Sequence, residues 1–289
     1  MSDQAQALRN LIKERTGGQM EKNARLLTVT SGKGGVGKSN FSLNFGLALQ
    51  SLGRKVLVID ADIGMANLDV LMGIPAPYSL YHLFTGAKSI RDIIQLGPSG
   101  LHFVAGGSGF RELLHLTDRQ LQEADEQLGM LQGEYDFILF DTGAGLTRES
   151  ERFIQAAHET FVVTTPEPTS ITDAYALVKM VSGSMPDTRF RVVVNRAFDE
   201  QEGRHTAAKM DMAADRFLGI RLPYGGYVAD DGKVGKAVRT QKPFLIAYPD
   251  SDAARSIMQI ARQYLDLPAD SLPHRSVKGI LQQWFSRKR

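Results

Sequence analysis

The stretch TSGKGGVGKSN, residues 30–40, decides how this chain folds. Its Gly32, Gly37, Lys38 and Ser39 satisfy the pattern G-x-x-x-x-G-K-[ST] of a phosphate-binding P-loop. In such a loop the backbone N–H groups surround the phosphates, the lysine contacts the β- and γ-phosphates, and the hydroxyl binds Mg²⁺. The residues expected to contact the nucleotide here are Gly34, Gly35, Val36, Gly37, Lys38, Ser39 and Asn40.

Short apolar runs alternate with helical patterns along the rest of the chain. The expected strands are 26–30, 55–59, 101–104, 137–140, 160–164 and 191–194, and the expected helices include 39–52, 118–132, 170–180 and 251–265. The strands have no polar face, which is typical of a sheet covered on both sides. The pattern therefore predicts an α/β fold with a doubly wound, mostly parallel sheet, whose ligands bind beyond the carboxyl ends of the strands.

Composition excludes several classes of protein. The chain has 289 residues and no cysteine, which rules out disulfides, thiolate chemistry, cysteine-ligated zinc and iron–sulfur clusters. It has no apolar signal segment and no apolar run near the roughly 18–20 residues of a membrane span, so we expect a cytoplasmic protein. Five basic residues and no acidic one lie between Arg275 and the end, which leaves 29 basic and 32 acidic residues, a net charge of −3, in the body.

Three carboxylates directly follow apolar strands. Asp60 and Asp62 come after strand 55–59, and Asp141 comes after strand 137–140. A carboxylate at such a strand end beside a P-loop is expected to hold Mg²⁺ or its waters, although a strand-end aspartate can also cap the next turn. The candidate metal ligands are Ser39, Asp60 and Asp141.

These motifs resemble those of one protein family. KGGVGKS, residues 33–39, is similar to the deviant Walker A motif of the MinD/ParA family of dimerising ATPases. DADIGMANLDVLMG, residues 60–73, resembles the first switch segment of that family and is closest to its MinD branch. Residues 222–244 resemble the loop that closes over the base, and the similarity runs from about Arg25 to Leu265. The resemblance implies a P-loop NTPase fold that binds ATP and Mg²⁺.

The resemblance also implies catalytic roles. Lys33 would reach across a two-fold interface to the phosphates of ATP in the partner subunit, so that ATP favours a homodimer and hydrolysis releases it. Asp62 would orient the attacking water, Lys38 would hold phosphate oxygens, and Asp141 would hold a water bound to Mg²⁺. From the sequence alone, Lys33 could equally be a solvated lysine.

Contacts to the base are also implied by the resemblance. Asn195 matches the family residue that reads adenine. Pro223 and Tyr224 stand where the family usually has a proline and an acidic residue, and Tyr224 is expected either to stack on adenine or to lie in the core. The second switch reads DTGAG, with Gly143 where proline is common, so it is expected to be looser.

The C-terminal residues 275–289 form an amphipathic pattern. The apolar positions are Val277, Ile280, Leu281, Trp284 and Phe285. Their spacing covers one helix face, and basic residues flank it, which is typical of a helix lying in an anionic membrane surface. The alternative is a last helix docked on the body. Two weak copies in a dimer would bind more tightly than one, so ATP would control membrane attachment.

The N-terminal stretch DQAQALR, residues 3–9, resembles a motif of the flagellar FlhG branch of the family. That resemblance implies binding to the signal-recognition-type GTPase FlhF and stimulation of its GTP hydrolysis. The contact residues would be Gln4, Leu8 and Arg9. A generic amphipathic helix remains the alternative.

Three parts follow from these observations. Residues 1–24 are expected to be a partner-binding arm and linker, residues 25–270 the ATPase domain, and residues 271–289 a membrane-targeting helix.

The expected function is a slow switch ATPase that controls flagellar number and placement, bound peripherally to the inner face of the cell membrane in its ATP state. Flagellar basal-body components are candidate further partners. A MinD division-site ATPase is the main alternative. A ParA-type DNA-partition ATPase is less favoured, because the acidic body predicts no nucleic-acid binding.

Overall fold

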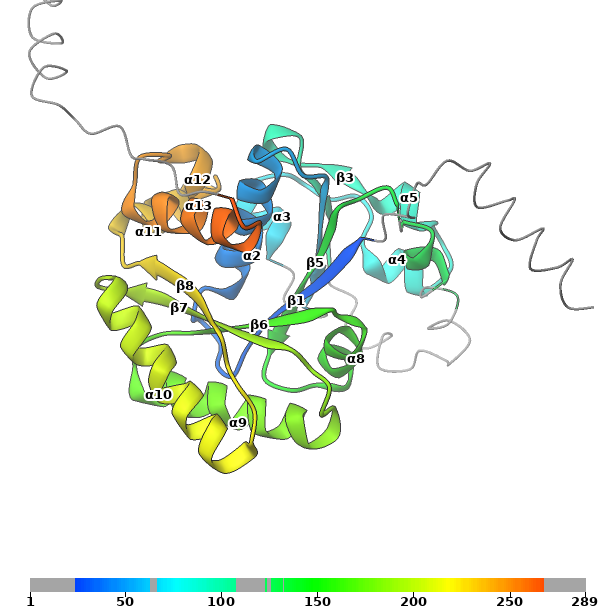
Figure 1. The fold of residues 1–289 in the computed structure, drawn as a ribbon. Coiled ribbons are helices and arrows are strands. Elements are labelled where there is room, and N and C mark those ends of the chain that lie inside the picture. Colours follow the sequence, from blue (N-terminus) through cyan, green and yellow to red (C-terminus); the bar gives the residue numbers. More distant parts are fainter. Residues whose placement is uncertain (1–23, 63–66, 108–122, 124–125, 132, 268–289) are drawn as a thin grey trace, which may run out of the picture.

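The computed structural model describes residues 24–62, 67–107, 123, 126–131 and 133–267 (Figure 1). The described residues form an eight-stranded sheet with the order β3-β4-β2-β5-β1-β6-β7-β8. The strands are β1 (Arg25–Ser31), β2 (Val56–Ala61), β3 (Gln95–Leu96), β4 (His102–Val104), β5 (Phe137–Ala144), β6 (Glu159–Thr164), β7 (Phe190–Ala197) and β8 (Tyr224–Ala229). Neighbouring strands are parallel except for β3 and β4. The predicted fold class is confirmed.

Helices cover both faces of this sheet. They are α2 (Lys38–Ser51), α3 (Leu68–Met72), α4 (Leu80–Phe84), α5 (Ile90–Ile93), α8 (Arg148–Ala156), α9 (Pro168–Ser184), α10 (Glu200–Leu218), α11 (Gly232–Arg239), α12 (Phe244–Ala247) and α13 (Asp252–Tyr264). Figure 1 shows α2, α12 and α13 on one side of the sheet and α8, α9 and α10 on the other. No helix within the described residues is both long and apolar enough to cross a membrane.

The alternation of side chains along each strand divides the core between these two faces. On β2, Val56 and Val58 pack in the cluster under α2, whereas Leu57 and Ile59 pack in the cluster with α4. All four side chains are buried, which explains why the strand reads as a continuous apolar run.

The six expected strands and most expected helices form close to their predicted positions. Helix 118–132 lies mostly outside the described residues, as do the arm and the C-terminal helix, with Gln4, Leu8, Arg9, Val277, Ile280, Leu281, Trp284 and Phe285.

The expectation that residues 222–244 form a loop is wrong, because this segment contains β8 and α11. Strand β8 carries two glycines, and a Cβ at Gly226 would lie 2.5 Å from Ile260 Cγ1 of α13. Close packing of α13 therefore explains why this strand has few of the side chains that mark strands in a sequence.

Candidate nucleotide-binding site

The P-loop connects β1 to α2 with two glycines in the left-handed region. Gly35 has φ 77° and Gly37 has φ 91°, conformations that disfavour any side chain. Gly37 is the N-cap of α2, and its carbonyl accepts a hydrogen bond from Phe41 N at 2.9 Å. The free N–H groups at the start of this 14-residue helix make an anion site where Lys38 and Ser39 begin the helix.

Gly32 places the loop against the neighbouring helix α9. A Cβ at this position would lie 2.1 Å from the carbonyl carbon of Asp173, so only glycine fits. The loop is therefore held by the fold before any nucleotide is bound.

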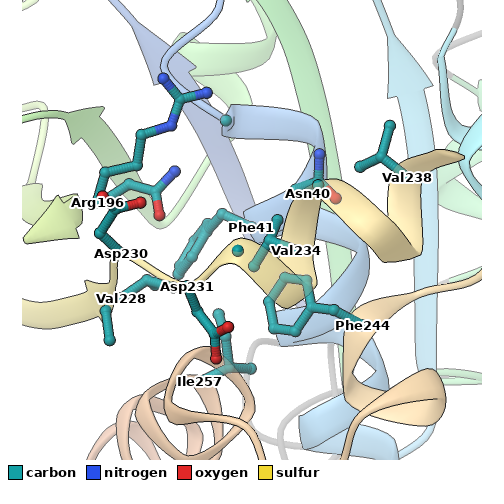
Figure 2. A pocket seen from close by; sticks show the side chains of 15 residues that line it. Asn40, Phe41, Arg196, Val228, Asp230, Asp231, Val234, Val238, Phe244 and Ile257 are labelled. Atoms are coloured by element: carbon teal, nitrogen blue, oxygen red, sulfur yellow. The ribbon is translucent and has the colours of Figure 1, made fainter.

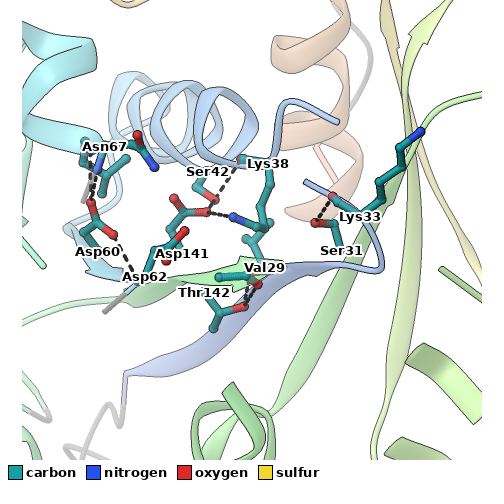
Figure 3. Close-up of polar contacts among 12 residues, drawn as sticks. Val29, Ser31, Lys33, Lys38, Ser42, Asp60, Asp62, Asn67, Asp141 and Thr142 are labelled. Carbon is teal, nitrogen blue, oxygen red and sulfur yellow. Dashed lines mark hydrogen bonds and ion pairs between the residues drawn. The ribbon is translucent and has the colours of Figure 1, made fainter. Parts of the chain in front are cut away.

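Lys38 and Asp141 form the buried centre of the site (Figure 3). Lys38 Nζ lies 3.7 Å from Asp141 Oδ1, which also accepts a hydrogen bond from Ser42 Oγ at 2.8 Å. Asp141 is fully buried and its Oδ2 has no hydrogen-bond partner. A buried carboxylate oxygen without a partner beside a P-loop fits a water bound to Mg²⁺, with the hydroxyl of Ser39 as the expected protein ligand.

Asp60 has a different position from the one expected of a metal ligand. Its Oδ2 accepts hydrogen bonds from the backbone N–H groups of Asn67, at 2.7 Å, and Leu68, at 3.1 Å. Its Oδ1 accepts one from Asp62 N at 3.1 Å. Both carboxylate oxygens of Asp60 accept hydrogen bonds from backbone N–H groups, so the structure does not support direct binding of Mg²⁺ by Asp60. Burial, and secondly the charge of Asp141, raise the pKa of Asp60 to about 7.

Asp62, which belongs to the first switch segment, lies against the second. A Cβ at Gly143 would be 3.2 Å from Asp62 Oδ1, so the carboxylate of Asp62 is close to the DTGAG segment. In the structure this segment continues strand β5 through Gly143. Thr142 Oγ1 donates to Val29 O at 3.0 Å, and Gly145 N donates to Ser31 O at 2.8 Å. The position of Asp62 suits a group that orients water near the phosphates.

Lys33 points away from this centre, as Figure 3 shows. Its Nζ donates to Thr169 Oγ1 at 3.2 Å and lies 3.8 Å from Glu167 Oε2, at the start of α9. The Lys33 and Glu167 side chains are 43% and 61% exposed, so this ion pair contributes little to stability. Lys33 is therefore at the surface of the site that its own P-loop forms.

A cavity of about 450 Å³ adjoins the P-loop at the carboxyl ends of β7 and β8 (Figure 2). Its apolar lining is Phe41, Val228, Val234, Val238, Phe244 and Ile257. Its polar lining includes Asn40, Asn195, Arg196, Asp230 and Asp231. An apolar cavity of this size with a few polar groups suits a base and its ribose.

Asn195 joins this cavity to the P-loop. Its Nδ2 donates a hydrogen bond to Val36 O at 2.7 Å, across 159 positions of sequence. A Cβ at Gly37 would lie 2.2 Å from this nitrogen, so Gly37 also makes room for Asn195. One amide hydrogen and Oδ1 remain for the edge of a base.

Pro223 and Tyr224 are not brought to this cavity, which corrects the prediction that they contact adenine. Tyr224 begins β8, in register with Val192, so it lies at the opposite end of the strand from the cavity. Its ring packs against the Arg204 guanidinium, 5.1 Å from the ring centroid. The residues that follow β8 beside Asn195 are Asp230 and Asp231. Recognising YGGYVA as a strand would have pointed to them, because ligands bind beyond the carboxyl ends of strands.

Comparison with known proteins identifies the family. Residues 24–189 match the model of an AAA domain. The antiactivator FleN of Pseudomonas aeruginosa is 39% identical over 249 residues, which cover 86% of this chain and 89% of FleN. The flagellum site-determining protein YlxH of Helicobacter pylori is 32% identical over 98% of both chains. The chain belongs to the FleN/YlxH branch of the MinD/ParA ATPases.

Solved structures of the MinD/ParA ATPases agree with this assignment. The MinD cell-division ATPase of Pyrococcus furiosus superimposes with a TM-score of 0.71 at 24% identity, over 85% of this chain and all of that one. MinD of Pyrococcus horikoshii, solved with Mg-ADP, has a TM-score of 0.70 at 25% identity, over 87% of this chain and 98% of that one. As a member of this family, the protein binds ATP with Mg²⁺ and is an ATPase.

Proposed function

We propose that this chain is an ATP-controlled dimerising switch that regulates the number and placement of flagella. Its similarity to an antiactivator FleN and to a flagellum site-determining YlxH supports the flagellar role. MinD of Bacillus subtilis, a septum site-determining protein, is 30% identical, so division-site selection is the second candidate. FlhF binding separates the two.

The main support for an ATP-controlled dimer is the orientation of Lys33. A lysine of the P-loop that points away from its own site is available to a second subunit, and its weak contacts with Thr169 and Glu167 can be exchanged. ATP brings about four negative charges to a two-fold interface, and one Lys33 from each side would neutralise part of them. ATP would then stabilise the dimer, and loss of the γ-phosphate would release it.

Within each subunit, the described residues suit a division of labour in hydrolysis. Lys38 and the first N–H groups of α2 would hold the phosphate oxygens, and Asp62 would orient the attacking water. Asp141 and Ser39 would hold Mg²⁺ and its water; when bound, Mg²⁺ neutralises charge on the phosphates. Lys33 of the partner would stabilise the charge that develops during transfer.

The two ends of the chain would connect this switch to its targets. We assign residues 1–24 to FlhF, whose GTP hydrolysis they would stimulate, and residues 271–289 to an anionic membrane surface. The protein would bind the inner face of the cell membrane as an ATP dimer and leave it after hydrolysis. Basal-body components of the flagellum are candidate further partners.

The dimer step is tested by Lys33→Ala. Light scattering with ATP and Mg²⁺ should show a dimer for the wild type and a monomer for the variant, while nucleotide binding by the monomer is retained. Lys209→Ala, an exposed lysine of α10, is the control and should dimerise normally. An unchanged dimer fraction for Lys33→Ala would overturn the proposed switch.

A further inference from the structure

Arg196 has an unusual backbone conformation at the edge of the base cavity. Its φ is 56°, in the left-handed region that a residue with a long side chain seldom occupies. The register between β7 and β8 shifts between Asn195 and Ala197, so Arg196 is the extra residue of a bulge. Bulges beside binding sites redirect side chains, and backbone strain of this kind clusters at functional sites.

Within the described part of the chain, no hydrogen bond or ion pair involves the Arg196 side chain. The residue lines the cavity and is exposed, and among the described residues no carboxylate lies within 4.0 Å of its guanidinium. Asp230 and Asp231 line the same cavity without pairing with it. A surface arginine that served only stability would be expected to form such an ion pair. No such pair offsets the strained backbone of Arg196 within the described residues.

Both neighbours of Arg196 are held in place. Asn195 donates to Val36 O at 2.7 Å, and the carbonyl of fully buried Ala197 accepts from Asp230 N at 2.9 Å. The backbone of Arg196 is therefore fixed between Asn195, which is expected to meet the edge of the base, and the core. Figure 2 shows the Arg196 side chain pointing away from Val228 and Phe244.

We propose that Arg196 stacks on the outward face of the adenine and positions the base. Most side chains that line the cavity are apolar, and Asn195 and the exposed Arg196 lie among its polar lining. A base packed against the apolar side chains, with its edge at Asn195, would have one face left for Arg196 to cover. A planar guanidinium stacks on an aromatic ring, whereas the ammonium of lysine cannot stack in this way. Arg196 is the arginine beside this open face, and the bulge holds it there.

The test compares Arg196→Gly, Arg196→Ala and Arg196→Lys by calorimetric titration. Each variant should bind Mg-ADP roughly 5- to 10-fold more weakly than the wild type, and lysine should not restore the affinity. Binding of inorganic tripolyphosphate should not change in any of them, because the proposed contact is with the base. Lys236→Ala, an exposed cation of α11, is the control for loss of one charge and should bind Mg-ADP normally.

Arg196→Gly removes the side chain without the risk of a folding defect, because glycine adopts the positive φ without strain. Its apo form should unfold at a midpoint within about 3 °C of the wild type or above it. Wild-type affinity for Mg-ADP in Arg196→Gly would overturn the proposal. An equal loss of affinity for Mg-ADP and tripolyphosphate would also overturn it, because Arg196 would then act on the phosphates.

Discussion

Asp60 and Asp141 are register partners on neighbouring strands β2 and β5, and both are fully buried. They hold different segments: Asp60 accepts hydrogen bonds from the first switch segment, and Asp141 contacts Lys38 of the P-loop. Two carboxylates on adjacent strands thus join the switch to the phosphate site. Their proximity has an electrostatic cost, because burial and the charge of Asp141 raise the pKa of Asp60 to about 7.

This pKa predicts how the stability of the nucleotide-free protein depends on pH. A carboxyl whose pKa is about 7 in the folded state and 3.8 in the unfolded chain binds more protons when folded between those values. The free energy of unfolding should therefore fall as pH rises from 5 to 7, by about 2 kcal/mol from this group. Urea titrations in EDTA measure it. Asp60→Asn should lack this component, and equal pH dependence in both proteins would contradict the prediction.

Two glycines of the P-loop provide a matched pair. Gly32→Ala should destabilise the apo protein by about 2 kcal/mol or more, because its methyl group would overlap the backbone of α9. Gly34→Ala should fold normally, since no atom lies within 4 Å of a Cβ at that position. It should still weaken ATP binding, because the methyl group would occupy space next to the phosphates. Thermal unfolding and nucleotide titration separate the two effects; equal stability of both variants would argue against the tight contact with α9.

The sequence predicts the part of this fold that is encoded locally. The P-loop is a contiguous motif, and β2 and β5 each begin with an unbroken apolar run of four residues, so their places follow from composition and spacing. Strand β8 is missed because Gly225 and Gly226 replace the usual β-branched residues. The reasons lie in distant parts of the chain: a Cβ at Gly225 would meet the Arg191 side chain of β7, and one at Gly226 would meet Ile260 of α13. Because β8 is not evident from the sequence, Pro223 and Tyr224 are expected to contact the base, whereas the cavity lies at the other end of the strand.

Contacts between distant segments also escape sequence patterns. The sequence predicts Asp60 as a metal ligand because it follows an apolar strand. In the structure its carboxylate instead accepts hydrogen bonds from the N–H groups of Asn67 and Leu68. The hydrogen bond from Asn195 to Val36 depends on the register of β7 relative to the P-loop. A strand-end position identifies the edge of the sheet at which a side chain lies, but not its partner.

Asp62→Ala should separate dimerisation from hydrolysis. Orientation of the attacking water would be lost while phosphate contacts remain, so release of phosphate from ATP should fall by about 100-fold or more while the ATP dimer persists. Phosphate assays and light scattering on one sample measure both. Asp69→Ala removes a carboxylate from α3 and should hydrolyse ATP normally. Near-normal turnover by Asp62→Ala would show that Asp62 has another role.

Removal of residues 275–289 should abolish binding to anionic liposomes and leave ATP-dependent dimerisation intact. Binding by the full chain should rise with ATP and fall with salt, because salt screens the basic flanks of the helix. Trp284→Glu should weaken cosedimentation strongly, whereas Gln282→Glu, the same new charge on the polar face, should weaken it much less. Cosedimentation that ignores both nucleotide and salt would favour a helix docked on the body.

A peptide of residues 1–24 should stimulate GTP hydrolysis by FlhF without the rest of the chain. The spacing of Ala5, Leu8, Leu11 and Ile12 would place them on one side of a helix, and the glycine-containing linker would give the arm reach. In such a helix Gln4 would lie on that side and Arg9 beside it, where an amide can position water and a guanidinium can meet phosphate charge.

Variants of the arm peptide distinguish binding from stimulation. Gln4→Ala should reduce stimulation of FlhF more than binding, and Leu8→Asp should abolish both, because a charge would replace an apolar contact. Asn10 would fall on the opposite side of such a helix, so Asn10→Ala serves as the control, with unchanged activity expected. GTP turnover and peptide titration on FlhF measure the two quantities separately. If saturating wild-type peptide does not accelerate FlhF, the arm has lost its proposed partner, and division-site selection becomes the better reading of this chain.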